Sequence, residues 1–144
     1  MRFLLDTNTL SEATRDRPDA GVQEWIKDQP EQELAVSVLS LGEIRRGFLL
    51  LPDGRKESRL IDWLQQTLAE QFDGRVLSVD EPIAMEWGRL TAEGKRKGRR
   101  IPEIDALLVA TAVVRDLVLV SRNERHLAGW GPHVINPWSE KSRD

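Results

Sequence analysis

The sequence predicts an α/β protein in which a short parallel sheet lies between layers of helices. Three short segments, residues 3–5, 34–38 and 117–120, are apolar without alternation. Such runs are typical of parallel strands that are covered on both faces. Between them, apolar residues recur three and four positions apart, which is the spacing of a helix with one buried face. Strands and helices therefore alternate along the chain, as they do in the α/β class.

Weaker patterns complete the expected sheet and its helices. Residues 76–79 predict a fourth strand and residues 134–135 an edge strand, so we expect about four to five strands. The stretch 104–114 is apolar nearly all round, which predicts a helix buried against the sheet. Asp80, before Pro82, provides a start for the helix that precedes this stretch. The other helical stretches are marked by Val22, Trp25 and Ile26; by Leu41, Ile44, Phe48 and Leu51; by Leu60, Ile61, Leu64 and Leu68; and by Ile83, Trp87 and Leu90.

Length and composition limit the classes of protein that fit. The chain has 144 residues, which predicts a single domain spanning 1–144. Its 21 basic and 24 acidic residues give a net charge of −3, so contact with nucleic acid has to come from a local positive patch. The absence of cysteine excludes disulfides, thiolate zinc sites and cysteine nucleophiles, and two histidines are too few for a histidine-rich zinc centre. Carboxylates must therefore carry most of any chemistry.

The sequence shows no targeting segment. The apolar stretch at the start is too short before Asp6 to form a signal peptide. No run approaches the roughly 18 apolar residues that a membrane span needs. We therefore expect a cytoplasmic protein that does not contact a membrane.

Three acidic residues stand close to the carboxyl ends of predicted strands. Asp6 directly follows the first strand, Glu43 lies in the first turns of the helix after the second, and Asp105 opens the buried helix. In open α/β sheets, ligands bind beyond the carboxyl ends of the strands, near the switch in strand order. The positive end of a helix favours a carboxylate at each of these places. We therefore expect these three side chains to converge on one rim of the sheet, where the polar segment 121–123 also follows a strand.

Each of the three acidic residues also has a structural interpretation. Asp6 can cap the helix that follows it. Residues 40–43 have the pattern of a capping box that would include Glu43, and residues 9–12 have the same pattern. Taken singly, capping is favoured for both boxes and is as good an interpretation as function for Asp6. Asp105 favours function, because an ionised carboxylate among apolar neighbours is costly unless it is paired or bound to a metal.

Converging carboxylates repel one another, so either one of them holds a proton or a cation sits between them. Oxygen ligands without histidine or cysteine suit Mg²⁺, with Mn²⁺ as a substitute. Such an ion can activate a water molecule and stabilise the charge that develops on a phosphoryl group. If the three side chains meet, the sequence therefore indicates phosphodiester chemistry.

Four segments of the sequence, taken in order, resemble the motifs of PIN-domain proteins. The resemblance is narrower to the VapC toxins and their FitB-like branch, whose members often end in Asn-Pro-Trp, as residues 136–138 do here. It covers nearly the whole chain and implies a PIN-like three-layer sandwich that acts as a Mg²⁺-dependent endoribonuclease, the toxin of a toxin–antitoxin pair. It also implies a homodimer and a small antitoxin partner, a segment of which fills the active-site groove. The four segments are Leu4-Leu5-Asp6-Thr7-Asn8, Ser37-Val38-Leu39-Ser40-Leu41-Gly42-Glu43-Ile44, Ile101-Pro102-Glu103-Ile104-Asp105-Ala106-Leu107 and Ser121-Arg122-Asn123.

The resemblance also assigns roles to single residues. It implies that Asp6 and Asp105 hold Mg²⁺ directly, while Glu43 binds it through water or helps to deprotonate the attacking water. Where the family often has a fourth acidic residue, this sequence has Asn123 and, three positions later, His126. Asn123 would orient the metal shell with a neutral oxygen, and the number of metal ions, one or two, stays open. His126 is interpreted as a solvated side chain, with contact to a phosphate as the alternative.

Residues 94–100 form a basic segment in an otherwise acidic protein. This predicted loop comes shortly before Asp105, where the phosphate backbone of RNA would need neutralising. A solvated helix end is the alternative, because Lys and Arg favour helix C-termini. The dense clustering of charge favours RNA contact, foremost by Arg99 and Arg100. The cationic residues of the basic segment are Lys95, Arg96, Lys97, Arg99 and Arg100.

Three tryptophans can be assigned a place from their spacing. Trp25 and Trp87 fall on the apolar faces of their helices, which predicts core positions. Trp63 falls outside the apolar stripe of its helix, and we expect it to contact a second subunit or the antitoxin.

Two other functional classes have to be weighed against a ribonuclease. A non-catalytic PIN-like module that binds RNA or a partner protein is compatible with the missing fourth acidic residue, and it would bind metal without cleaving. An aspartate-based phosphatase or a receiver domain is disfavoured. Asn8 stands where such phosphatases usually have a second Asp, and Ser121 and Arg122 follow the strand after which a receiver would carry a lysine.

Overall fold

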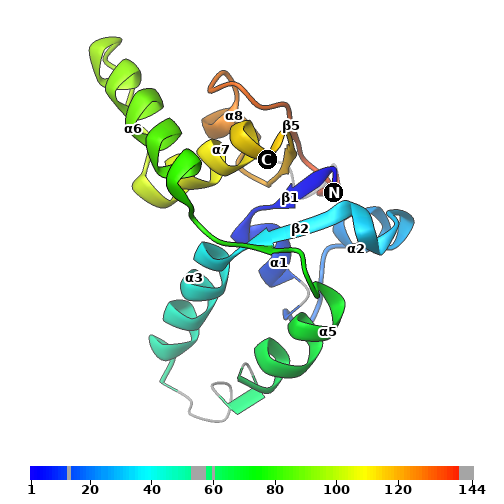
Figure 1. Cartoon of the computed structure of the whole chain (residues 1–144). Helices are drawn as coiled ribbons and strands as arrows, with labels where there is room; N and C mark the ends of the chain where they lie inside the picture. The colour runs from blue at the N-terminus through cyan, green and yellow to red at the C-terminus, as the bar shows by residue number, and fades with distance from the viewer. Residues whose placement is uncertain (13, 53–57, 60, 140–144) are drawn as a thin grey trace.

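Five short strands form one parallel sheet, in the order β3-β2-β1-β4-β5 (Figure 1). The computed structural model describes residues 1–12, 14–52, 58–59 and 61–139. Each strand forms where the sequence predicts one, although the second already ends at Ser37 because Val38 begins a helix. The strands are β1 (Phe3–Leu5), β2 (Leu34–Ser37), β3 (Val76–Leu77), β4 (Val118–Val120) and β5 (Val134–Ile135).

Strand β1 lies at the centre of the sheet. It pairs with β2 on one side, where Phe3 is opposite Leu34, and with β4 on the other side, where Phe3 is opposite Val118. The chain therefore builds β2 and β3 outward on one side of β1 and then crosses over to build β4 and β5 on the other. This switch in direction marks the carboxyl ends of β1 and its neighbours as the place where such sheets bind ligands.

The sheet is the middle layer of three, as the sequence predicts, because successive strand residues point to opposite faces. Leu4 belongs to a first buried cluster covered by α6 and α7, and Phe3 and Leu5 belong to a second one covered by α1, α2 and α3. Trp87 packs against the first cluster and Trp25 against the second, both partly buried as predicted. The helical elements are α1 (Thr7–Glu12), α2 (Ala20–Asp28), η1 (Glu31–Glu33), α3 (Val38–Leu49), η2 (Trp63–Leu68), α5 (Ala69–Gln71), α6 (Glu81–Arg96), α7 (Glu103–Arg115) and α8 (Glu124–Leu127).

Helices α6 and α7 pack against each other on one face of the sheet (Figure 1). The Asp80 carboxylate caps α6 by accepting a 3.2 Å hydrogen bond from the Ile83 N–H, and Pro82 stands in the first turn, as predicted. Helix α7 is buried along most of its length and ends at Asp116, whose φ of 54° closes the helix with a left-handed residue. Within the described ranges, no helix is long and apolar enough to cross a membrane.

The helical stretch after α3 differs from the prediction. Leu60 lies outside the described residues, and η2 is a π-helix that leads into α5. A π-helix is hydrogen-bonded from i to i+5, so its side chains leave the positions that ordinary helical spacing assigns to them. Trp63, the first residue of η2, is partly buried against the second hydrophobic cluster, so the prediction that it stands outside the apolar stripe is wrong, while its contact with a second subunit or the antitoxin stays a prediction.

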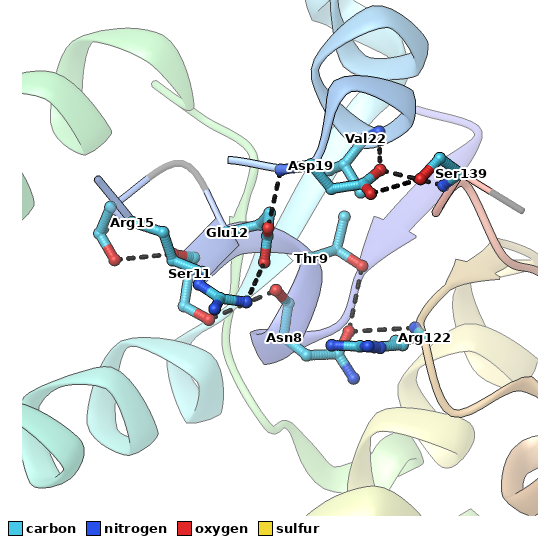
Figure 2. Close-up of polar contacts among 10 residues, drawn as sticks. Asn8, Thr9, Ser11, Glu12, Arg15, Asp19, Val22, Arg122 and Ser139 are labelled. Carbon is cyan, nitrogen blue, oxygen red and sulfur yellow. Dashed lines mark hydrogen bonds and ion pairs between the residues drawn. The ribbon is translucent and has the colours of Figure 1, made fainter. Parts of the chain in front are cut away.

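The C-terminal end of the described chain is tied to the start of α2. The Asp19 carboxylate caps α2 through the Val22 N–H at 3.1 Å. The same carboxylate accepts hydrogen bonds from the N–H of Ser139 at 3.0 Å and from its hydroxyl at 2.7 Å (Figure 2). Trp138 is buried beside this clamp. Ser139, directly after the Asn-Pro-Trp segment, therefore ties the last of the described residues to the start of α2.

Candidate active site

Asp6 is buried at the carboxyl end of β1, directly before α1. One carboxylate oxygen accepts the Thr7 N–H at 2.7 Å, and the other accepts the Ser121 hydroxyl at 2.6 Å. Burial raises the pKa of Asp6, the two hydrogen bonds oppose that rise, and the charge of Glu43 adds to it. A carboxylate has about four acceptor positions, so Asp6 keeps capacity for a further ligand. Asp6 thus begins the helix and also faces the other acidic residues.

Ser121 connects the ends of β1 and β4. Besides donating to Asp6, its oxygen accepts the Asn123 N–H at 2.9 Å and the Asn8 side-chain amide at 3.3 Å. The Asn8 oxygen in turn accepts the Arg122 N–H at 3.2 Å (Figure 2). Sequence reasoning assigned no role to Ser121, although it stands in the last of the four motifs. Its position directly after a buried strand is shared with other polar residues, so no signal in the sequence singles it out.

Glu43 lies on α3 and faces α1. The Thr7 hydroxyl donates a hydrogen bond to a Glu43 carboxylate oxygen and shares a 2.9 Å hydrogen bond with the Ser40 hydroxyl. Ser40 is buried and Glu43 is half-buried. Thr7 therefore joins the first motif to the second and fixes the direction of the Glu43 side chain. This role also escaped sequence reasoning, because the pairing joins residues 36 positions apart.

Asp105 occupies the first turn of α7 and is half-buried. Burial, followed by the charges of Asp6 and Glu43, raises the pKa of Asp105 from 3.8 to about 6, and the charge of His126 opposes the rise. Such coupling requires the carboxylates to lie near one another. Asp6, Glu43 and Asp105 therefore lie within range of one another's charge near the switch point of the sheet, and we refer to them as the carboxylate cluster.

The two residues at the fourth position lie on and beside α8. Asn123 precedes the helix, its side chain is exposed, and its N–H is held by Ser121. His126 is exposed on the helix, yet its charge acts on Asp105. His126 is therefore a neighbour of the carboxylate cluster rather than a remote surface residue.

Neither predicted capping box forms. Helix α3 begins at Val38 with Ser37 as its cap, which accepts the Leu39 N–H at 3.1 Å, so residues 40–43 lie inside the helix. Helix α1 begins two residues before Thr9, whose hydroxyl donates to the Val120 carbonyl at 2.9 Å. In both places, the helix begins at the end of the preceding strand, before the position that the capping-box pattern indicates. The capping interpretation of Glu43 is therefore wrong.

The basic segment is only partly a loop. Lys95 and Arg96 form the last turn of α6, Lys97 ends the helix and pairs with Glu93 at 3.0 Å, and all five cationic residues are exposed. Arg99 donates to the carbonyls of residues 128 and 129 and stacks over Trp130, with 4.6 Å from its guanidinium carbon to the ring centroid. Arg99 thus has a structural role between α6 and the segment after α8, while Arg100 is exposed.

The donor set of the carboxylate cluster fits Mg²⁺. Its ligand atoms are carboxylate oxygens, and burial together with mutual repulsion makes a cation among them favourable. Among the described residues, no three Asp, Glu or His side chains converge closely enough to form a complete ligand group. Mg²⁺ does not need one, because it typically binds one or two carboxylates and keeps several waters.

Comparison with known proteins connects this arrangement with one family. The PIN domain family matches residues 3–128. Plasmid stability protein StbB of Pseudomonas syringae pv. tomato is 33% identical over 136 residues, covering 94% of this chain and 98% of that protein. Toxin FitB of Neisseria gonorrhoeae is 31% identical over 138 residues, covering 96% and 99%. VapC ribonuclease Y4jK of Sinorhizobium fredii is 30% identical over 136 residues, covering 94% and 97%.

Solved structures agree with these relationships. The crystal structure of FitAcB from Neisseria gonorrhoeae matches with a TM-score of 0.88 at 32% identity, covering 94% of this chain and 98% of that chain. A parallel sheet of this order with acidic residues at its switch point is the arrangement of a PIN domain, and the chain belongs to the PIN domain family. Within that family, its relatives place it among the VapC ribonucleases and FitB toxins.

Proposed function

We propose that this protein is the toxin of a toxin–antitoxin pair and hydrolyses RNA phosphodiesters with the help of Mg²⁺. The observation that carries the proposal is the mutual effect of the Asp6, Glu43 and Asp105 charges near the switch point of the sheet. Relatives that are similar over nearly the whole chain are named as a toxin, FitB, and as a ribonuclease, Y4jK. An RNA strand that lies across this rim of the sheet brings a phosphodiester to the three carboxylates.

The proposed reaction divides the work among the residues of the site. Asp6 and Asp105 hold the ion. When bound, Mg²⁺ supplies positive charge that stabilises the charge developing on the phosphoryl group. Glu43, oriented by Thr7, accepts a proton from the attacking water as its oxygen bonds to phosphorus and the bond from phosphorus to the leaving nucleoside oxygen breaks. Asn123 presents a neutral amide beside the cluster and orients bound water.

The partners follow from the same proposal. The relatives of solved structure include FitAcB and FitAB bound to a DNA fragment, both complexes of FitB with FitA. We infer for this chain a small antitoxin that covers the carboxylate cluster, and a homodimer of the toxin. The basic segment, with Arg100 foremost, is proposed to contact RNA beside Asp105.

Asn123 is compatible with a second function, that of a non-catalytic module. A neutral side chain stands where the family often has a fourth acidic residue, which lowers the negative charge available for metal ions. A non-catalytic module that binds RNA and metal is the function that this substitution favours.

Incubation of the pure protein with total RNA separates the two functions. We expect discrete fragments in the presence of Mg²⁺, no fragments in EDTA, and none from the Asp105→Asn variant. Asp28→Asn, which removes an exposed carboxylate from α2, is the matched control and should cut like the wild type. Calorimetry that shows Mg²⁺ and RNA binding without cleavage would select the non-catalytic module. Cleavage that persists in EDTA would contradict the proposed use of a metal.

The Thr7→Val variant tests how Glu43 is positioned. Valine has nearly the same shape but offers no hydroxyl, so Glu43 loses its hydrogen bond and its fixed direction. We expect the cleavage rate in Mg²⁺ to fall about tenfold to a hundredfold and the free energy of unfolding to fall by about 1 kcal/mol. Thr7→Ser restores the hydroxyl and should recover most of the rate. A rate that Thr7→Val leaves unchanged would show that Glu43 needs no support from Thr7.

A further inference from the structure

A groove of about 620 Å³ lies away from the carboxylate cluster, between the chain that follows α1, the end of α3 and the start of η2. We propose that this groove binds nucleotides of the RNA strand next to the segment that is cut. The inference rests on the proposed function, because it names a second place where the same substrate is held. The groove is lined by Thr14, Arg15, Asp16, Arg17, Phe48, Leu51, Arg59 and Trp63, and we refer to it as the Arg–Trp groove.

The helices of the active site also lead to the Arg–Trp groove. Thr7, which holds Glu43, begins α1, and Thr14 in the groove follows the end of that helix. Likewise, Glu43 lies in the middle of α3 and Phe48 near its end. A rise of 1.5 Å per residue separates Glu43 from Phe48 by about 8 Å along the helix axis. A strand bound at the carboxylate cluster therefore reaches the groove within a few nucleotides.

The charge of the Arg–Trp groove suits a polyanion. Arg15, Arg17 and Arg59 line it against a single acidic residue, Asp16, although the whole chain is acidic. Arg15 also lies 3.5 Å from Glu12, a weak and mostly exposed pair that leaves most of its guanidinium donors available. Guanidinium groups bind phosphate oxygens with two parallel hydrogen bonds, which lysine cannot do.

The apolar part of the groove suits bases. Trp63 and Phe48 are partly buried against the second hydrophobic cluster, so their rings are held in place while they line the groove. Bases of any sequence stack on such aromatic faces. Aromatic rings surrounded by arginines form the combination found where proteins hold single-stranded nucleic acid. By contrast, in the basic segment Arg99 is already bound to two carbonyls and Trp130, and Lys97 is paired with Glu93.

Binding of a short fluorescein-labelled oligouridylate to the full-length Asp105→Asn protein tests the inference. Trp63→Leu should weaken binding about tenfold, because it removes one stacking face. Arg17→Gln should weaken binding and lower the slope of log affinity against log salt by about 0.7, the value for one phosphate contact on a single strand. Lys27→Gln, which removes one exposed charge from α2, should leave both quantities unchanged.

The outcomes separate this inference from the proposed function. If Trp63→Leu and Arg17→Gln bind RNA as Lys27→Gln does, while circular dichroism shows that they are folded, the inference is overturned even if the wild type cuts RNA. If both variants lose affinity but the wild type cuts no RNA in Mg²⁺, the groove binds RNA and the proposed reaction is wrong. If poly-glutamate binds in a way that depends on Arg17 and RNA does not, the groove takes an acidic protein segment, and the inference is again overturned.

Discussion

Asp105→Asn is expected to abolish RNA cleavage and, in the metal-free protein, to raise the free energy of unfolding at neutral pH. The loss of cleavage, roughly a thousandfold, follows from removing one of the two carboxylates proposed to hold the metal. The gain in stability follows from the raised pKa of Asp105, because burial and then the charges of Asp6 and Glu43 make its ionised form unfavourable. A variant with a higher free energy of unfolding that no longer cleaves RNA indicates that the carboxylate serves function and not stability.

The pH window of this effect follows from the two pKa values of Asp105. The pKa is about 6 in the folded protein, against an ordinary value of 3.8. Between these values, the folded state keeps a proton that the unfolded chain has lost, so stability falls as pH rises through the window and stays lower above it. The full shift corresponds to about 3 kcal/mol, and solvent screening of a half-buried side chain reduces this to roughly 1–2 kcal/mol.

Urea denaturation in EDTA at several pH values checks the prediction for Asp105→Asn. We expect the variant to exceed the wild type by that amount above about pH 6 and to match it below about pH 3, where Asp105 is protonated in both states. Asp28→Asn, on the exposed face of α2, should follow the wild type throughout. A variant that is less stable than the wild type at neutral pH would show that Asp105 is a structural residue.

Ser121→Ala is expected to weaken the fold and shift the pH dependence of metal binding. The hydroxyl is fully buried and has three partners, namely Asp6, Asn8 and the N–H of Asn123. Its loss leaves buried polar groups unpaired, which costs about 2 kcal/mol. Because the Ser121 hydrogen bond lowers the pKa of Asp6, its removal raises that pKa further. More Asp6 is then protonated at a given pH, so Mg²⁺ binding should begin at higher pH.

Calorimetric titration of Mg²⁺ across a range of pH, together with urea denaturation, measures both effects. Ser121→Thr keeps the hydroxyl and is the matched control, so its pH dependence should stay close to that of the wild type. If Ser121→Ala loses stability but its Mg²⁺ binding has an unchanged pH dependence, Ser121 supports the fold alone and does not tune Asp6.

The layers of the fold could be predicted because they depend on burial. Strands such as 3–5 are apolar on both faces, and only helices on both sides of a sheet satisfy such a run. The starts of helices were harder to predict. Residues 9–12 and 40–43 form good capping boxes locally, but each helix begins earlier, at the end of its strand. The π-helix η2 could not be predicted either, because a prediction from the spacing of apolar residues assumes the 3.6 residues per turn of an α-helix.

The acidic residues of the site could be found because Asp6 stands at a strand end, Asp105 in the first turn of a helix, and Glu43 in the helix that directly follows a strand. Alternation of strands and helices indicates a parallel sheet, and the strand order found in the structure places β1, β2 and β4 side by side. The supporting residues could not be found in this way. Thr7 and Ser121 act by hydrogen bonds across 36 and 115 positions of sequence, and nothing local distinguishes them from other polar residues after a strand.

The hydrogen bond between Asp6 and Ser121 also means that the site can form only late in the synthesis of the chain. Ribosomes build a chain from its N-terminus, and Asp6 emerges long before Ser121, which follows it by 115 positions. Until β4 has been made and paired with β1, the Asp6 carboxylate lacks its hydrogen bond from Ser121. The central strand β1 is then paired on one side alone. A nascent chain that ends before Ser121 therefore lacks a part of the site, and the proposed ribonuclease activity should arise only when synthesis is nearly complete.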